Sequence, residues 1–136
     1  MNNRVVHFEI GVEDTERAIN FYRNTFNWKI EKWESTDPKM EYWLITTGEK
    51  ETPGIDGGLF KRENEPEPSK DSQNAANYLC TISIEDIDES IASIKENGGD
   101  VITEKMEIPK VGVMAYARDT EGNIFGIMQS DPNAMM

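Results

Sequence analysis

The sequence predicts an α+β fold built from two tandem βαβββ units. Residues 4–12 alternate between apolar and polar side chains, which is typical of a half-buried strand. A helical, amphipathic pattern follows this strand directly. The same succession returns later in the chain, since Asp86 stands 72 residues after Asp14 in an equivalent place. Duplication of one supersecondary unit accounts for all three observations.

The first unit is predicted to span about residues 4–63. Alternation puts His7, Glu9 and Gly11 on one face of its first strand, with the apolar residues on the other. Asp14 stands as the N-cap of a helix of about 12 residues, because its carboxylate can accept the free amides of the first turn. Three strands are expected after the helix, at residues 27–33, 41–47 and 54–60.

The second unit is predicted to span about residues 77–130, after a linker at about 64–76 that is polar and contains two prolines. Its first strand covers residues 78–84, and Asp86 caps a helix with an isoleucine stripe at Ile87, Ile91 and Ile94. Gly98 ends this helix, where a left-handed residue is usually needed. Strands are expected at residues 101–108, 111–117 and 124–129.

Length and composition indicate a single domain over residues 1–136. Fourteen basic and 26 acidic side chains give a formal charge of −12, which argues against nucleic acid as a partner because its phosphates would be repelled. No apolar run is long enough to cross a membrane, and the chain opens without a secretory signal, so we expect a cytoplasmic protein. Cys80, the one cysteine, is expected to be a small buried hydrophobe.

Two segments carry a family resemblance. The run from His7 to Asp14, followed by residues 17–22 and 26–28, resembles the opening of proteins of the vicinal oxygen chelate superfamily, which includes glyoxalases, bleomycin resistance proteins and dioxygenases. Residues 118–126 resemble that family's Asp-Pro-x-Gly-Asn turn and last strand, with Thr120 replacing the proline. The resemblance covers nearly the whole chain. It implies paired half-barrels around a central cavity, and we expect a homodimer.

Members of that family commonly hold a divalent metal through the first and last strand of each unit. Carried onto this chain, the four ligand positions are His7, Gly58, Leu79 and Gly126. Leucine and glycine side chains have no donor atom, and one imidazole does not bind a cation usefully alone. We therefore expect no metal and no cofactor. A slip of one or two residues at Gly58 would leave open a different set, in which Glu9, Asp56 or Glu63 approaches the site.

The same resemblance gives candidate site residues. His7 and Glu9 are candidates for a catalytic pair of general base and orienting group, and a small organic ligand is expected against His7, Gly58, Leu79, Thr81, Gly126 and Met128. The two glycines either leave room for that ligand or let strands pack closely. Four further residues lie on strands of uncertain register and are expected to be core: Tyr42, Trp43, Met114 and Tyr116. Trp28 and Trp33 are expected to pack the helix on the sheet.

Three functions remain open at this point. The first is a small-molecule binding protein of the bleomycin-resistance kind, without the family metal. The second is an enzyme, a metal-dependent lyase, isomerase or dioxygenase of the glyoxalase type. The third is an interaction module with a vestigial pocket.

Overall fold

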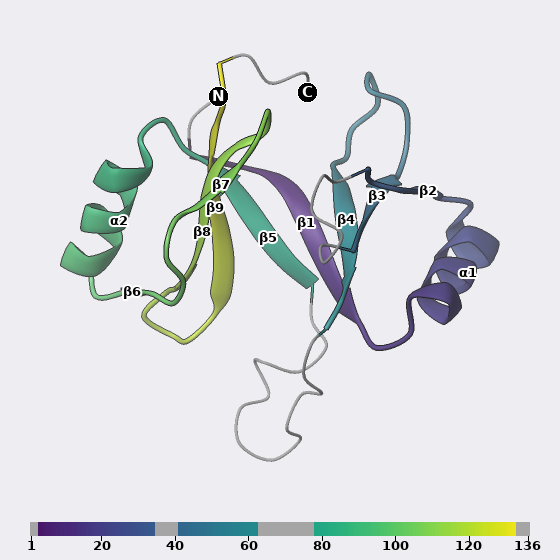
Figure 1. Ribbon diagram of the computed structural model, residues 1–136, viewed down its shortest axis with the longest axis horizontal. Coiled ribbons are helices and arrows are strands. Elements are labelled where there is room, and N and C mark those ends of the chain that lie inside the picture. Colours follow the sequence, from purple (N-terminus) through teal and green to yellow (C-terminus); the bar gives the residue numbers. More distant parts are fainter. Residues whose placement is uncertain (1–2, 35–40, 63–77, 133–136) are drawn as a thin grey trace. The chain divides into compact units, whose positions relative to one another are not determined.

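The computed structural model of the protein describes residues 3–34, 41–62 and 78–132 (Figure 1). Helices and strands follow one another in the order β-α-β-β-β and then β-α-β-β-β-β, so the α+β class is confirmed. The chain divides into two compact units, with the boundary between Tyr78 and Leu79. We call residues 7–78 the N-terminal unit, and residues 79–136 together with residues 1–6 the C-terminal unit. The predicted linker and Glu63 lie outside the described residues.

The N-terminal unit is a mixed sheet with one helix. Its strand order is β2-β3-β4-β1, in which β1 and β4 are parallel and the other pairs are antiparallel. The elements are β1 (Arg4–Val12), α1 (Thr15–Phe26), β2 (Lys29–Lys32), β3 (Tyr42–Thr46) and β4 (Asp56–Lys61). The first three residues of β1 group with the C-terminal unit.

Local sequence explains where α1 begins and ends. Asp14 accepts a hydrogen bond from the Arg17 amide at 3.0 Å, as expected of an N-cap. At the other end Asn27 adopts a left-handed conformation with φ 60°, and its amide bonds to the Arg23 carbonyl. The helix has the 12 residues that the apolar spacing indicated.

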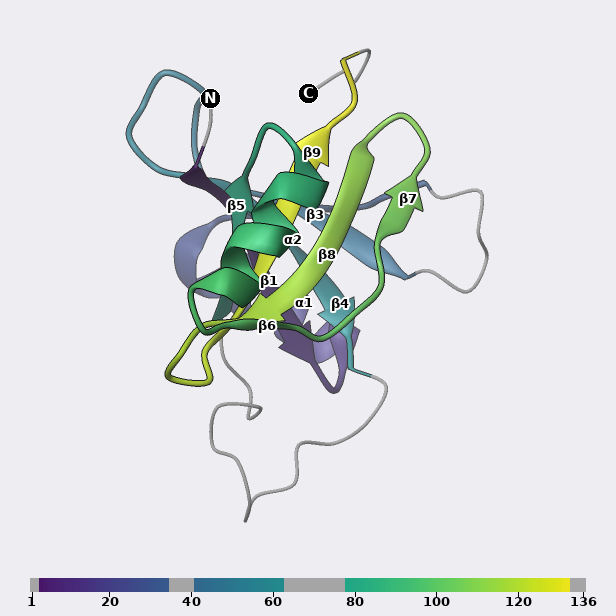
Figure 2. The same ribbon diagram turned by 90° about the vertical axis from the view of Figure 1, so that its left-hand side faces the viewer.

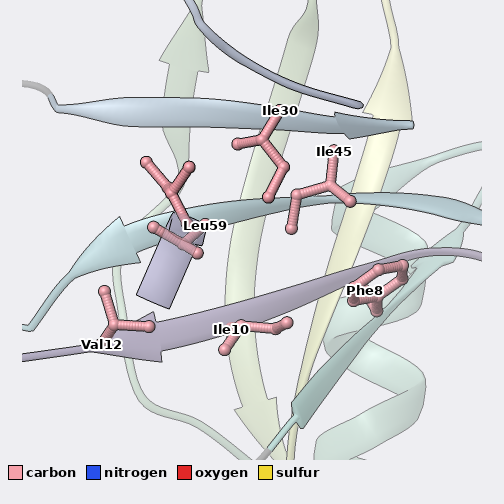
Figure 3. Packing of buried hydrophobic residues seen from close by; sticks show 7 residues of the cluster. Phe8, Ile10, Val12, Ile30, Ile45 and Leu59 are labelled. Carbon is pink, nitrogen blue, oxygen red and sulfur yellow. The ribbon is translucent and has the colours of Figure 1, made fainter. Parts of the chain in front are cut away.

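The core of this unit lies between α1 and one face of the sheet. Side chains from all four strands meet there, as Figure 3 shows for six of them, and Ile19 of the helix packs among them. The buried members are Phe8, Ile10, Val12, Ile19, Ile30, Ile45 and Leu59. Trp28 and Trp43 pack against this cluster, as predicted. Burying such side chains stabilises by about 1.5–3 kcal/mol each, which is the main force holding α1 to the strands.

The C-terminal unit repeats the plan with one change. Its sheet has the order β5-β9-β8-β6, and β7 also pairs with β8. The predicted strand at residues 101–108 is broken into two short pieces, which both pair with β8. The elements are β5 (Tyr78–Ser83), α2 (Ile87–Glu96), β6 (Asp100–Val101), β7 (Met106–Ile108), β8 (Gly112–Arg118) and β9 (Ile124–Ser130).

Helix α2 covers one face of this sheet, against β8 and β9 (Figure 2). Asp86 accepts the amides of Asp88 and Glu89, and Gly98 has φ +96°, so both predicted helix ends are confirmed. The core contains Ile84, Ile87, Ala115 and Ile127. Cys80 is exposed, so its predicted burial is wrong. The error arises because Cys80 lies near the start of β5, ahead of the buried Ile84.

Strand register repeats between the units. In the parallel pair β1 and β4, Glu9 is opposite Gly58, and in the parallel pair β5 and β9, Thr81 is opposite Gly126. Thr81 lies 72 residues after Glu9, which is the offset seen between the two helix caps. No helix within the described parts of the chain is long and apolar enough to span a membrane.

Candidate functional site

Each sheet has a second face, directed away from its helix, which we call the distal face. In the N-terminal unit the alternation that buries Phe8 and Ile10 puts His7, Glu9 and Gly11 there. Register then adds Asp56, Gly58 and Phe60 from β4 and Tyr42 and Leu44 from β3. The predicted placement of His7 and Glu9 away from the helix core is therefore found, and Tyr42 joins them.

His7 and Tyr42 form the central contact of this face. Nε2 of His7 lies 2.8 Å from the Tyr42 hydroxyl, a hydrogen bond between residues 35 positions apart. The ring of Trp33 meets the Tyr42 ring edge to face, with centroids 6.1 Å apart. Trp33 thus packs on Tyr42, and its predicted place between helix and sheet is wrong. Trp33 follows β2 directly, and its amide bonds to the Tyr42 carbonyl at 2.8 Å, which pairs the two residues.

The space beside Gly58 is filled by Tyr42. A β-carbon at residue 58 would overlap the Tyr42 hydroxyl and ring, so a larger residue there would require Tyr42 to move. Gly11 is covered in the same way, since a β-carbon there would lie 3.0 Å from the ring of Phe60. In this structure Tyr42 occupies the space beside Gly58, which favours close packing as the interpretation of this glycine.

Burial and nearby charge act on His7 in opposite directions. Burial lowers the pKa of His7 below its ordinary value of 6.5, while the carboxylates of Glu9 and Asp56 partly offset that effect. Below its lowered pKa the imidazole would be charged, so at neutral pH it is the uncharged form that faces Tyr42. Glu9 itself is only 6% exposed. A neutral imidazole can accept a proton, which is what a general base needs.

The distal face of the C-terminal unit carries the other predicted ligand-binding residues. Thr81 is buried at 4% exposure opposite Gly126, and Met128 follows Gly126 on the same face of β9. A β-carbon at Gly126 would lie 2.9 Å from the Thr81 hydroxyl oxygen and 3.5 Å from the Tyr116 ring. Leu79 is half-buried at the start of this face. The lining is mixed, since Leu79 and Met128 are apolar while Thr81 and Tyr116 carry hydroxyl groups.

These registers test whether the family's metal would fit. Gly58 and Gly126 occupy equivalent places, each opposite the residue two positions after His7 or Leu79, so a slip of the alignment at Gly58 is not needed. Only His7 of the four positions has a donor atom, and its Nε2 is bonded to Tyr42. Within residues 3–34, 41–62 and 78–132, no three His, Cys, Asp or Glu side chains gather as a metal site. The residues present do not fit the family metal.

A protein-family model matches most of the chain. The model of the Glyoxalase/Bleomycin resistance protein/Dioxygenase superfamily matches residues 4–127. The chain belongs to this superfamily. A glyoxylase-like domain-containing protein from Didymella fabae is 27% identical over 129 residues, which cover 93% of this chain and 94% of the relative.

Solved structures of the superfamily share the fold. A hypothetical protein from Bacillus halodurans C-125 is 19% identical over the whole of both chains, with a TM-score of 0.70. Methylmalonyl-CoA epimerase from Mycobacterium tuberculosis is 13% identical over 94% of this chain and 88% of the enzyme, with a TM-score of 0.65. A single-substitution variant of the Streptomyces coelicolor methylmalonyl-CoA epimerase, in complex with 2-nitronate-propionyl-CoA, is 15% identical over both whole chains, with a TM-score of 0.68. At these identities the likeness concerns the fold alone.

A surface depression of about 350 Å³ lies elsewhere in the N-terminal unit. Its lining belongs to the loop after β1, the start of α1 and the end of β4. The residues are Glu13, Asp14, Thr15, Arg17 and Lys61, none of which is a predicted site residue. Arg17 already lies 4.0 Å from both Glu13 and Asp14, so this depression is a solvated rim of charged side chains.

Sequence reasoning missed Tyr42 and Tyr116, which were both expected in the core. Tyr116 lies beside Gly126 on the distal face of its unit. Tyr42 lies on the distal face of the N-terminal unit in contact with His7. The alternation of residues 42–46 contained the information, because the buried Ile45 and the core-packed Trp43 put Tyr42 and Leu44 on the opposite face. What the sequence lacked was the pairing of Leu44 with Gly58, which brings Tyr42 over the glycine.

Proposed function

We propose that this protein binds a small organic molecule on the distal face of a sheet and does so without the divalent metal of its superfamily. The observation that carries the proposal is the repeated register, with Glu9 opposite Gly58 and Thr81 opposite Gly126. It puts glycine at the last-strand ligand position of both units. Metal affinity in proteins comes from several donors held together, and here His7 stands alone among four positions.

The negative charge of the chain and of the groups near His7 indicates which ligands fit the distal face. The chain has a formal charge of −12, and the carboxylates of Glu9 and Asp56 act on His7. These negative charges would repel an anionic ligand at this face, so an uncharged or cationic molecule with apolar surface fits better. In the C-terminal unit Leu79 and Met128 supply apolar contact and Thr81 supplies a hydroxyl, and in the N-terminal unit His7 supplies a hydrogen-bonding group. The CoA thioester bound to the Streptomyces coelicolor epimerase is a useful anionic comparison.

A thermal-shift screen tests the proposal. Uncharged, cationic and anionic aromatic compounds, a CoA thioester, and zinc, nickel and manganese ions alone are each added to the full chain. We expect some uncharged or cationic compounds to raise the melting temperature, because a ligand that binds only the folded state stabilises it. Met128→Ala should reduce the shift, and Ile102→Ala is the matched control because Ile102 is exposed and lies on neither predicted site. A rise with a metal ion alone would count against the proposal.

An enzyme is the second candidate, favoured by the neutral state of His7. An uncharged imidazole close to the Glu9 carboxylate has the character of a general base, which suits a lyase or isomerase reaction. Loss of turnover in both His7→Ala and Glu9→Gln, with ligand binding retained, would favour this candidate. If no compound shifts the melting temperature, an interaction module with a vestigial pocket becomes the better explanation.

Location and assembly belong to the same proposal. We propose a cytoplasmic homodimer, and light scattering of the purified full chain measures the second part directly. A molar mass near 15.5 kDa at all concentrations would show a monomer instead.

A further inference from the structure

Tyr42 combines three features that point to one role. Its hydroxyl lies 2.8 Å from Nε2 of His7, which is the one nitrogen or oxygen donor left among the family's ligand positions. Its ring fills the place where a side chain at residue 58 would begin. Trp33 holds the ring from the side, edge to face.

The first feature concerns competition for the imidazole. A cation that is to bind Nε2 must first break the hydrogen bond between His7 and Tyr42. Half-buried hydrogen bonds cost more to break than exposed ones, because the separated groups are not fully hydrated. Tyr42 therefore weakens any metal affinity of His7.

The second feature concerns the residue opposite. An ordinary ligand side chain at position 58 would have to start within the volume that Tyr42 now fills, so Tyr42 would have to leave its present position to admit one. The overlapping atoms are the far end of the Tyr42 side chain, so a ligand at position 58 requires the ring to turn away and to give up its hydrogen bond to His7. Gly58 and Tyr42 thus form a matched pair, in which the aromatic residue on β3 uses the space that the glycine on β4 provides.

We propose that Tyr42 is the specificity-determining residue of the N-terminal unit. Its ring fills the space in which a metal ligand at residue 58 would lie, and its hydroxyl holds Nε2 of His7 in a hydrogen bond. The inference rests on the proposed metal-free function and explains how this unit excludes a cation. A ligand at this face would therefore contact a phenol and an imidazole that are already hydrogen-bonded to each other.

A zinc titration followed by NMR tests this role. His7 is the only histidine of the chain, so the imidazole Cε1 proton signal is assigned without ambiguity. Zinc alone is added to the full chain, to Tyr42→Phe and to Tyr22→Phe. The first variant deletes the hydroxyl and keeps the ring. The second makes the same change at a tyrosine whose hydroxyl bonds to Tyr78, so it is the matched control.

We expect the His7 signal of Tyr42→Phe to respond at zinc concentrations about tenfold lower than in the unchanged chain, from the loss of one competing hydrogen bond. Tyr22→Phe should behave like the unchanged chain. A second variant, Tyr42→Ala with Gly58→Glu, puts a carboxylate into the vacated space and should bind zinc more tightly still. Adding His7→Ala to that variant should remove the gain.

The outcomes separate the two proposals. If the unchanged chain binds zinc through His7 with a stoichiometry near one, the metal-free function is wrong. If the unchanged chain and Tyr42→Phe both ignore zinc over the same range, the capping role is wrong while the metal-free function stands. A folded Tyr42→Phe, checked by its dispersed amide spectrum, is sufficient for this decision even if the double variant does not fold.

Discussion

The ring of Tyr42 lies over Gly58, so closely that a β-carbon at residue 58 would overlap the phenol. This packing makes the two positions interdependent. Gly58→Ala should destabilise the fold by about 1–3 kcal/mol, the usual effect of an overpacked site. In the Tyr42→Ala background the same change should cost less, and the difference is the coupling free energy between neighbours. Urea unfolding of the four proteins of this cycle measures it. Equal costs in both backgrounds would show that Tyr42 does not occupy the space.

His7 should titrate below its ordinary pKa. Because burial is the main cause and Glu9 opposes it, Glu9→Gln should lower the pKa of His7 further. NMR titration of the single histidine measures both values. Because the pKa of His7 is lower in the folded state, the unfolded chain takes up a proton at a higher pH than the folded chain does. The stability that His7 contributes is therefore fully present above about pH 6.5 and is lost as the pH falls through the folded pKa. A pKa above 6.5 in the unchanged chain would contradict the burial seen here.

His7→Ala is expected to leave the fold intact. The imidazole lies on the distal face and is not part of the hydrophobic cluster against α1. Its loss leaves the Tyr42 hydroxyl without the His7 nitrogen, which should cost about 1–2 kcal/mol, well below a core truncation. Circular dichroism and urea unfolding check this. Loss of the folded signal would place His7 in the core.

In the C-terminal unit, the loss of stability on truncating a side chain should increase with the burial of that side chain. Ile127 is 2% exposed, and Ile127→Ala should cost about 3–5 kcal/mol. Ile91 is partly buried against the same cluster, so Ile91→Ala should fall near the lower end of the 2–5 kcal/mol range for such changes. Ile102→Ala, at an exposed position, should change stability by less than about 0.5 kcal/mol. A reversed order of the first two would contradict the placement of β9.

Tyr78 provides a test at high pH. Burial and the hydrogen bond that the Tyr78 hydroxyl donates to Tyr22, at 2.7 Å, raise the pKa of Tyr78 from 10.0 to about 12. Since the folded pKa lies above the unfolded value, the stabilising effect is complete below about pH 10 and is lost as the pH rises towards 12. Tyr22→Phe should bring the pKa down. Ultraviolet titration of the four tyrosines measures the shift.

Much of the fold followed from local sequence signals. The helix caps at Asp14 and Asp86 and the apolar stripes are short-range features, and the structure places them where the spacing indicated. The face that holds His7 and Glu9 followed from alternation alone, because the side-chain period of a strand is fixed. The 72-residue offset even anticipated the equivalent register of Glu9 and Thr81.

Features that depend on how distant strands pair could not be predicted from the sequence. The contact of Tyr42 with His7 joins residues 35 positions apart and depends on how β3 pairs with β4. Trp33 was misplaced for the same reason, since its partner is set by the pairing of β2 with β3. A glycine in the sequence indicates available space, but the side chain that uses the space comes from another strand.

Metal content tests the central claim most directly. The full chain is expressed and purified without chelator, incubated with equimolar zinc, nickel or manganese, and desalted before elemental analysis. Because Gly58, Leu79 and Gly126 supply no donor atoms beside His7, the account predicts far less than one equivalent of each metal per chain. Retention of about one equivalent, lost in His7→Ala, would contradict it.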